Sequence, residues 1–122
     1  MARMVVAYKF EKLEVWQMAV EYIDMIYKIA ELLPKNEEYN LRSQITRAAT
    51  SIALNIAEGS TGQSDAEQNR FLGMALRSLI ETVACLHLIK RRSYVTNEDA
   101  QAVYAFGEKL SIKLQAFRKA LN

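Results

Sequence analysis

Apolar residues recur every three or four positions through four long segments of this chain, and this spacing constrains the fold more than any other feature. The segments cover about residues 13–33, 40–57, 65–91 and 97–121. Such a period places apolar side chains along one face of an α-helix. A chain of 122 residues with only four glycines and one proline has little to interrupt these helices. The sequence therefore predicts one all-α domain over residues 1–122.

Helix-ending and helix-capping residues separate the four segments. Pro34 ends the first, because its ring disfavours a helical conformation at the preceding residue. Gly59 lies just beyond the second and is a typical helix-ending residue. Ser64 and Glu67 match a capping box at the start of the third, and Thr96 caps the fourth. Because the connections are short, we expect an antiparallel up-down-up-down four-helix bundle.

The composition also indicates the cellular compartment of the protein. The single cysteine, Cys85, cannot form a disulfide within the chain and agrees with a reducing compartment. The single histidine, His87, lies two residues away, which is not the spacing of a helical contact, so the pair does not indicate a catalytic dyad. The longest uninterrupted apolar runs are far shorter than the roughly 20 residues that cross a bilayer, and the N-terminus lacks a signal-peptide core. We expect a cytoplasmic protein that contacts no membrane.

The second segment carries a narrow polar stripe beside its apolar one. At about 100° per residue, Glu58 and Ser51 fall close to Arg47 on the helical wheel. Because a buried charge or amide without partners is costly, we interpret the stripe as a hydrogen-bonded polar seam inside the fold. Antiparallel packing on the third helix predicts an ion pair between Arg47 and Glu81. The predicted seam comprises Gln44, Arg47, Ser51, Asn55, Glu58 and Glu81.

The enzymatic interpretation of this stripe, an acid–base site built on Glu58, has little support. No nucleophile, nearby histidine or second carboxylate shares the face. The chain also lacks a glycine-rich phosphate loop and any cysteine or histidine spacing typical of a metal site. We expect neither an enzyme nor a bound cofactor or metal.

The remaining side of the second segment is rich in small residues, including Ala49, Ala53 and Ala57. A helix that is apolar or small nearly all round is normally buried all round, yet a four-helix bundle leaves one side of each helix exposed. We therefore expect a neighbouring subunit to cover these alanines. The alternative is a water-exposed face rich in alanine and hydroxyl groups.

Charge is unevenly distributed along the chain, although the formal net charge is only +2. Acidic residues dominate the first helix, whereas the last fourteen residues, 109–122, carry four bases and no acid. A surface that contacts phosphates needs lysines and arginines held together. The candidates for nucleic-acid contact are Arg42, Lys90, Arg91, Arg92, Lys109, Lys113, Arg118 and Lys119.

The stretch LRSQITRAATSIALNIAEG, with FEKLEVWQMA before it and SDAEQNRFLGMALRSLIETVACL after it, resembles the bacterial four-helix bundle protein family. That family includes proteins encoded in intervening sequences of large-subunit ribosomal RNA genes, and its relatives include the accessory variability protein of diversity-generating retroelements. The likeness covers roughly residues 10–95. It implies a single up-down bundle, a homo-oligomer that is commonly a pentamer, a basic surface for nucleic acid, and no established enzymatic activity.

This chain departs from the usual family pattern at three positions. Ala53 stands where a proline is common, which should straighten the second helix. Gln63 replaces a common arginine, and Arg77 replaces a common glycine, so positive charge is redistributed.

Two functions follow from the sequence. The first is a homo-oligomeric adaptor that binds RNA, DNA or a ribonucleoprotein through its basic residues, with ring assembly multiplying each weak patch. The alternative is a protein–protein scaffold that docks a partner such as a reverse transcriptase without touching nucleic acid.

Overall fold

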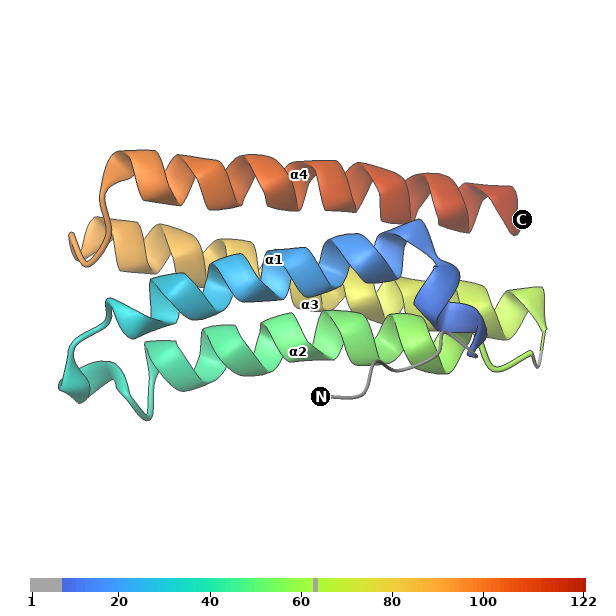
Figure 1. Cartoon of the computed structure of the whole chain (residues 1–122), viewed down its shortest axis with the longest axis horizontal. Coiled ribbons are helices and arrows are strands. Elements are labelled where there is room, and N and C mark those ends of the chain that lie inside the picture. Colours follow the sequence, from blue (N-terminus) through green and yellow to red (C-terminus); the bar gives the residue numbers. More distant parts are fainter. Residues whose placement is uncertain (1–7, 63) are drawn as a thin grey trace, which may run out of the picture.

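The computed structural model describes residues 8–62 and 64–122, and these form four long helices (Figure 1). No strand occurs within the described ranges. Successive long helices run in opposite directions, so the predicted all-α up-down-up-down bundle is confirmed. The elements are η1 (Lys9–Lys12), α1 (Glu14–Glu31), η2 (Lys35–Glu37), α2 (Leu41–Gly59), α3 (Asp65–Arg91) and α4 (Asn97–Ala120).

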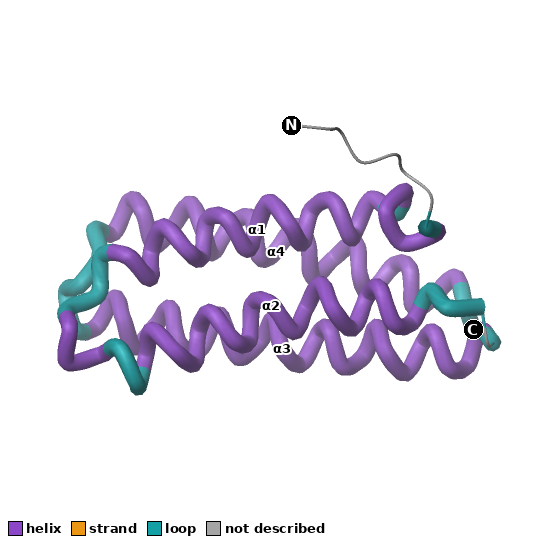
Figure 2. The backbone as a smooth tube through the Cα atoms, turned by 60° about the horizontal axis from the view of Figure 1, so that its bottom comes forward, coloured by secondary structure: helices purple, strands orange, loops and turns teal. Residues whose placement is uncertain are grey.

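Each of the four helices packs against two neighbours, and Figure 2 shows α1 and α4 on one side of the bundle and α2 and α3 on the other. Contacts join α1 to α2, α2 to α3, α3 to α4, and α4 back to α1. The face formed by α1 and α2 therefore lies on the opposite side of the bundle from the face formed by α3 and α4. The largest fully buried side chains fill the space between them and include Tyr22, Ile26, Ile45, Ile52, Leu79, Leu110 and Leu114.

Side-chain caps set two of the helix starts as predicted. The Ser64 hydroxyl accepts a hydrogen bond from the backbone N–H of Glu67 at 3.1 Å, and α3 begins at Asp65. The Thr96 hydroxyl accepts one from the N–H of Asp99 at 3.1 Å, and α4 follows. Each cap satisfies an N–H group that the first helical turn would otherwise leave unpaired.

Gly59 has a different role from the predicted one. It is the last residue of α2 and does not lie beyond it. A Cβ atom at this position would lie only 2.9 Å from the Cβ of Phe71, so the absence of a side chain lets the end of α2 approach α3 closely. The turn that follows contains Gly62, whose positive φ of 86° suits glycine. Gln63, singled out in the sequence, lies outside the described residues.

Two buried hydroxyl groups pair across the core. Tyr22 of α1 and Thr82 of α3 are both fully buried, and their oxygens lie 2.8 Å apart. The Thr82 hydroxyl donates its hydrogen to the carbonyl of Leu79 at 2.6 Å, so Tyr22 donates to Thr82. The ring of Tyr22 stacks on Phe106 with centroids 6.2 Å apart, and Gly107 leaves room for it. These contacts hold three helices around one polar pair.

Among the described helices, α3 alone has a window long and apolar enough to cross a bilayer, with a mean hydropathy of 1.5. Within the bundle, 44% of that window is buried. The core helix of a soluble protein meets the same criterion, so this window by itself does not indicate a membrane-spanning helix.

Candidate nucleic-acid interface

The polar stripe of α2 lies on the water-facing side of the helix. Arg47, Glu58 and Gln44 are exposed, so the prediction of a buried seam is wrong for these three residues. Glu81 is exposed as well and forms no ion pair with Arg47 among the described residues. The Arg47 guanidinium instead donates a long hydrogen bond of 3.4 Å to the hydroxyl of Ser43. These groups stay outside because water solvates them at lower cost than a buried ion pair would require.

A short part of the predicted seam does exist. Asn55 donates its side-chain N–H to the backbone carbonyl of Ser51 at 2.9 Å and to the Ser51 hydroxyl at 3.1 Å. The hydroxyl of Ser78 in α3 donates to the Ser51 hydroxyl at 2.9 Å. Ser51 and Asn55 are half-buried, and together with Ser78 they form a polar contact between α2 and α3.

The alanine side of α2 faces the core. Ala49 is 0% exposed and Ala53 4% exposed within a single chain, so the prediction that a second subunit covers them is wrong. Arg42 lies on the same side of α2, and its guanidinium donates to the carbonyl of Leu33, just past the end of α1, at 2.7 Å. This side therefore packs toward α1, and small side chains allow a close approach. Ala57, on the same side, is half-buried.

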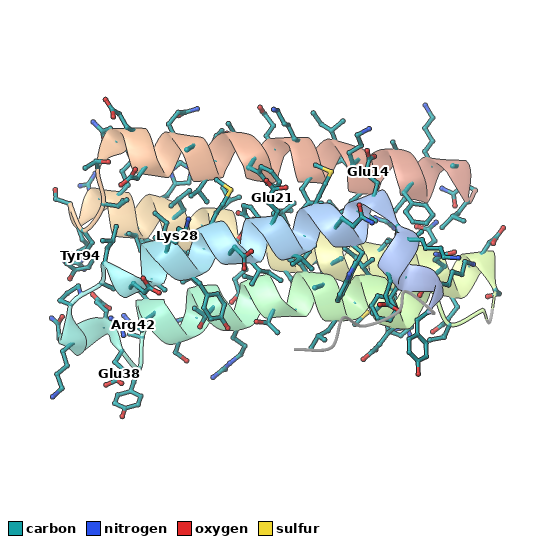
Figure 3. All side chains as sticks on the ribbon, viewed as in Figure 1. Glu14, Glu21, Lys28, Glu38, Arg42 and Tyr94 are labelled. Atoms are coloured by element: carbon teal, nitrogen blue, oxygen red, sulfur yellow. The ribbon has the colours of Figure 1, made fainter. Side chains whose placement is uncertain are left out.

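The eight candidate bases do not form one surface. Arg42 is half-buried and tied to the chain that follows α1, at the end of the bundle where Tyr94 also lies (Figure 3). Lys113 forms an ion pair with Glu14 at 3.1 Å, between α4 and α1. The remaining candidates are divided between opposite ends of the bundle and the middle of α4. Lys90 and Arg91 end α3 and Arg92 directly follows it, whereas Lys109 lies in the middle of α4 and Arg118 and Lys119 lie near its end.

Arg92 belongs to a polar cluster at the first of these ends. Glu37 of η2 is buried, and its carboxylate accepts hydrogen bonds from the Tyr94 hydroxyl and the Asn40 side-chain amide, both at 3.0 Å. The N–H of Leu41 adds a longer one at 3.5 Å. Burial raises the pKa of the Glu37 carboxyl, but these hydrogen bonds and the positive charge of Arg92 outweigh burial and leave the pKa below its ordinary value. The cluster ties the α1–α2 connection to the α3–α4 turn.

This depressed pKa predicts an acid-sensitive bundle end. A carboxyl whose pKa is lower in the folded state stabilises the fold above its ordinary pKa of 4.5, and that contribution is lost as the pH falls through the folded-state value. Glu37→Gln keeps the shape but removes the titration. Between about pH 7 and about pH 3, we expect the variant to lose less free energy of unfolding than the wild type, measured by urea unfolding. An equal loss in both proteins would contradict this assignment.

A basic groove lies between α3 and α4 and extends from the other end of the bundle to its middle. Arg70 and Arg77 of α3 line it together with Arg118 of α4, and its volume is about 710 Å³. No acidic side chain lines the groove. Arg77 is exposed and forms no ion pair with any described residue. The other lining residues are Gly73, Met74, Leu76, Ile80 and Gln115.

Neighbouring side chains position Arg118. Its Nε donates to Asn69 Oδ1 at 2.6 Å, and the side-chain nitrogen of Asn69 donates in turn to Asn122 at 2.6 Å. A Cβ atom on Gly73 would lie 3.2 Å from the guanidinium carbon of Arg118, so the small size of this residue makes room for the group. The guanidinium is thereby held between two helices with nitrogen atoms left to bind a ligand.

Arg70 is partly engaged. Its guanidinium pairs with Glu67 at 2.6 Å and lies 4.7 Å from the ring centroid of Phe71. The pair is exposed, so a phosphate can compete with the carboxylate for the guanidinium at little cost.

Only Arg118 of this groove was predicted from the sequence. Arg70 and Arg77 were missed, although their separation of seven residues, about two helical turns, places them on one face of α3. That spacing was the available signal. The position of Arg118 beside them depends on the register between α3 and α4, which the sequence alone does not give.

Three guanidinium groups on one surface suit phosphate oxygens, because each planar group donates paired hydrogen bonds and keeps its charge. The described residues suit catalysis less well than they suit phosphate binding. Cys85 is buried, and burial, followed by the negative charge of Glu81, raises the pKa of its thiol, which disfavours the nucleophilic thiolate. Within residues 8–62 and 64–122 no three histidine, cysteine or acidic side chains are placed to share a metal ion. The groove has the chemistry of anion binding.

This chain resembles known proteins both in a sequence family and among solved structures. A family model described as 23S rRNA-intervening sequence protein matches residues 11–116. Among solved structures, the chain is similar to a protein with unknown function from the S23 ribosomal protein family of Bacteroides thetaiotaomicron VPI-5482, with 28% sequence identity and a TM-score of 0.79. The likeness covers 86% of this chain and 98% of that chain. None of the curated proteins compared with the chain matches it.

Proposed function

The chain belongs to the 23S rRNA-intervening sequence protein family, and from this premise we propose that it is a non-enzymatic, homo-oligomeric bundle that binds nucleic acid through its arginine groove. The family resemblance that the sequence indicates over roughly residues 10–95 is thereby confirmed. The name of the family associates its members with ribosomal RNA genes, and the groove supplies the chemistry for a phosphate backbone. RNA, free or within a ribonucleoprotein, is the proposed ligand in preference to DNA.

The observation that carries this proposal is the groove of Arg70, Arg77 and Arg118 without an acidic lining residue. It replaces the eight scattered bases as the candidate interface, and of those eight only Arg118 lines the groove. Three arginines bind a phosphate backbone only weakly, so the proposal includes self-assembly. Five subunits, the count that the family likeness implies, would present five such grooves to one RNA and raise the overall affinity through multivalency.

Salt dependence tests the proposal. Each phosphate that a base neutralises makes the slope of log affinity against log salt concentration more negative by about 0.7 to 0.9. Three arginines therefore predict a slope of about −2 to −3 for each groove that an RNA occupies. The measurement is a filter-binding titration of a structured RNA at increasing salt concentrations. Absence of binding at low salt would overturn the proposal and favour the alternative, a scaffold that docks a protein partner.

A further inference from the structure

The arginine groove continues beyond the middle of the bundle. A second hollow of about 280 Å³ adjoins it, and Ile80 and Gln115 line both hollows. A third hollow of about 130 Å³ follows, and Tyr104 lines both the second and the third. Because neighbouring hollows share side chains, the three form one continuous depression between α3 and α4. We call this depression the α3–α4 track, and it reaches from Arg118 to His87.

The track follows one face of each of its two helices. Its lining residues cluster every three or four positions, from Arg70 to His87 on α3 and from Tyr104 to Arg118 on α4. At one end Arg118 donates to Asn69 at 2.6 Å, and at the other the rings of Tyr104 and His87 meet edge to face with centroids 6.0 Å apart. Residues 70 and 87 lie about 25 Å apart along α3. At ~3.4 Å per stacked nucleotide, about seven nucleotides match this length.

The two parts of the track differ in chemistry. The first part, the arginine groove, is positively charged and has no acidic lining residue. The second part, formed by the other two hollows, is apolar and aromatic: Ile80 is 66% exposed, Ile112 is 61% exposed, and Tyr104 is exposed as well. This part also contains one acid, Glu108, and one lysine, Lys90, among the described residues, so it offers little net charge to a phosphate.

A single nucleic-acid strand has both kinds of group that the track can bind. Its phosphates suit the arginines, and its unpaired bases have flat apolar faces that stack on aromatic rings and pack on apolar side chains. A double helix keeps its bases paired and stacked inside and presents phosphates and sugars on the outside. A duplex would therefore contact the arginines and leave the isoleucines and the ring of Tyr104 without a partner.

We propose that the RNA bound by this protein is single-stranded and lies along the α3–α4 track. Its phosphates contact Arg70, Arg77 and Arg118, and its unpaired bases pack against Tyr104 and the exposed isoleucines. The inference rests on the proposed function and names the class of RNA that the same site binds. Because every base has a flat face for stacking, such binding tolerates many sequences.

A comparison of two RNAs tests the preference for a single strand. One is a non-self-complementary strand of about 12 nucleotides, within the usual range of single-strand site sizes, and the other is the blunt duplex of that strand with its complement. We expect wild-type protein to bind the single strand at least about fivefold more tightly, measured by fluorescence anisotropy. Charge alone would favour the duplex, whose phosphates are more densely spaced. Equal or tighter binding of the duplex would overturn the inference.

Replacing Tyr104 tests the contact with the bases. Tyr104→Ala should lower the affinity for the single strand at least about fivefold and leave the affinity for the duplex unchanged. The dependence of single-strand binding on salt should also stay unchanged, because the lost ring carries no charge. Tyr104→Phe keeps the ring and should bind as the wild type does.

Tyr27→Ala is the matched control for the alanine variant. Tyr27 is also a partly exposed helical tyrosine, at 48%, but it lies on the α1–α2 face, opposite the track. This variant should bind both RNAs as the wild type does. Far-ultraviolet circular dichroism verifies that each variant is folded. An equal loss in the two alanine variants would overturn the role given to Tyr104.

The same measurements separate this inference from the proposed function. A wild type that binds the duplex as well as the single strand would overturn the inference and leave the arginine groove as a site for the phosphate backbone. A Tyr104→Ala variant with wild-type affinity for both RNAs would also overturn it, and would leave the apolar part of the track to a protein surface. Absence of binding to either RNA at low salt would overturn the proposed function itself.

Discussion

Replacing Tyr22 with alanine is expected to lower the free energy of unfolding by about 3–5 kcal/mol. The side chain is fully buried, so its removal leaves a cavity among three helices. The change also deprives Thr82 of the hydroxyl that donates to it at 2.8 Å. Since the total stability of a small domain is about 5–15 kcal/mol, much of it would be lost. Urea unfolding followed by circular dichroism measures the difference.

Tyr39→Ala is the matched control. This tyrosine is 91% exposed in the connection between α1 and α2, so the same substitution should change stability by less than about 0.5 kcal/mol. Tyr22→Phe separates the hydroxyl from the ring, because it removes the hydrogen bond and leaves the stacking on Phe106. A loss of about 1 kcal/mol is expected for this variant. Equal losses in the two alanine variants would contradict the packing described for Tyr22.

Replacing Arg70, Arg77 and Arg118 together with glutamine is expected to reduce RNA affinity by roughly 100-fold at low salt. The loss should include most of the salt dependence, with the slope of log affinity against log salt concentration becoming shallower by about 2 to 3 for each groove. The physical reason is that glutamine keeps polar side chains in the groove but removes the charges that displace counterions. Filter binding over a range of salt concentrations measures both quantities.

The matched control replaces three bases outside the groove, Lys90, Arg91 and Lys109, with glutamine. The net charge changes by the same amount, so a general electrostatic effect would weaken both triple variants equally. A larger loss in the control than in the groove variant would place the interface elsewhere on the molecule. Thermal unfolding verifies that the loss of Arg118, which contacts Asn69, has not disrupted α4.

The four helices were predictable because periodicity and capping are local properties of the sequence. α3 begins at the residue that the Ser64 cap indicates, and α4 begins after Thr96. The C-terminal boundaries of the first two helices were less accurate. α1 ends at Glu31, earlier than the predicted residue 33. α2 continues through Gly59, beyond its predicted end at residue 57. This glycine allows close packing on Phe71 and does not form a left-handed turn.

The orientation of α2 was not predictable from its own pattern. The wheel shows a polar stripe and an alanine side, and either could have faced the core. Burying Ala49 and Ala53 against α1 costs little, since small apolar residues carry no polar atoms in their side chains. Burying Arg47 and Glu58 would have removed two charges from water, and an ion pair offsets that cost only when its geometry is excellent. The energetics of desolvation, and not the shape of the stripe, decide which side is inside.

The candidate interface was likewise not predictable from local sequence patterns alone. Each helix was recognisable, but the groove depends on how α3 and α4 are aligned, and no local pattern specifies that register. Arg70 and Arg77 share a helical face that the sequence reveals. Their proximity to Arg118 is a property of the folded molecule.

The close approach of α2 to α3 also bears on how the chain folds. The two helices are joined by a short connection that contains Gly62, and bringing the ends of a short loop together costs little entropy. Contacts such as that between Ser51 and Ser78 are therefore available early, before more distant segments have met. This helical hairpin is suited to act as the folding nucleus onto which α1 and α4 condense. The most distinctive stretch of the sequence would then guide the kinetics of folding as well as the final packing.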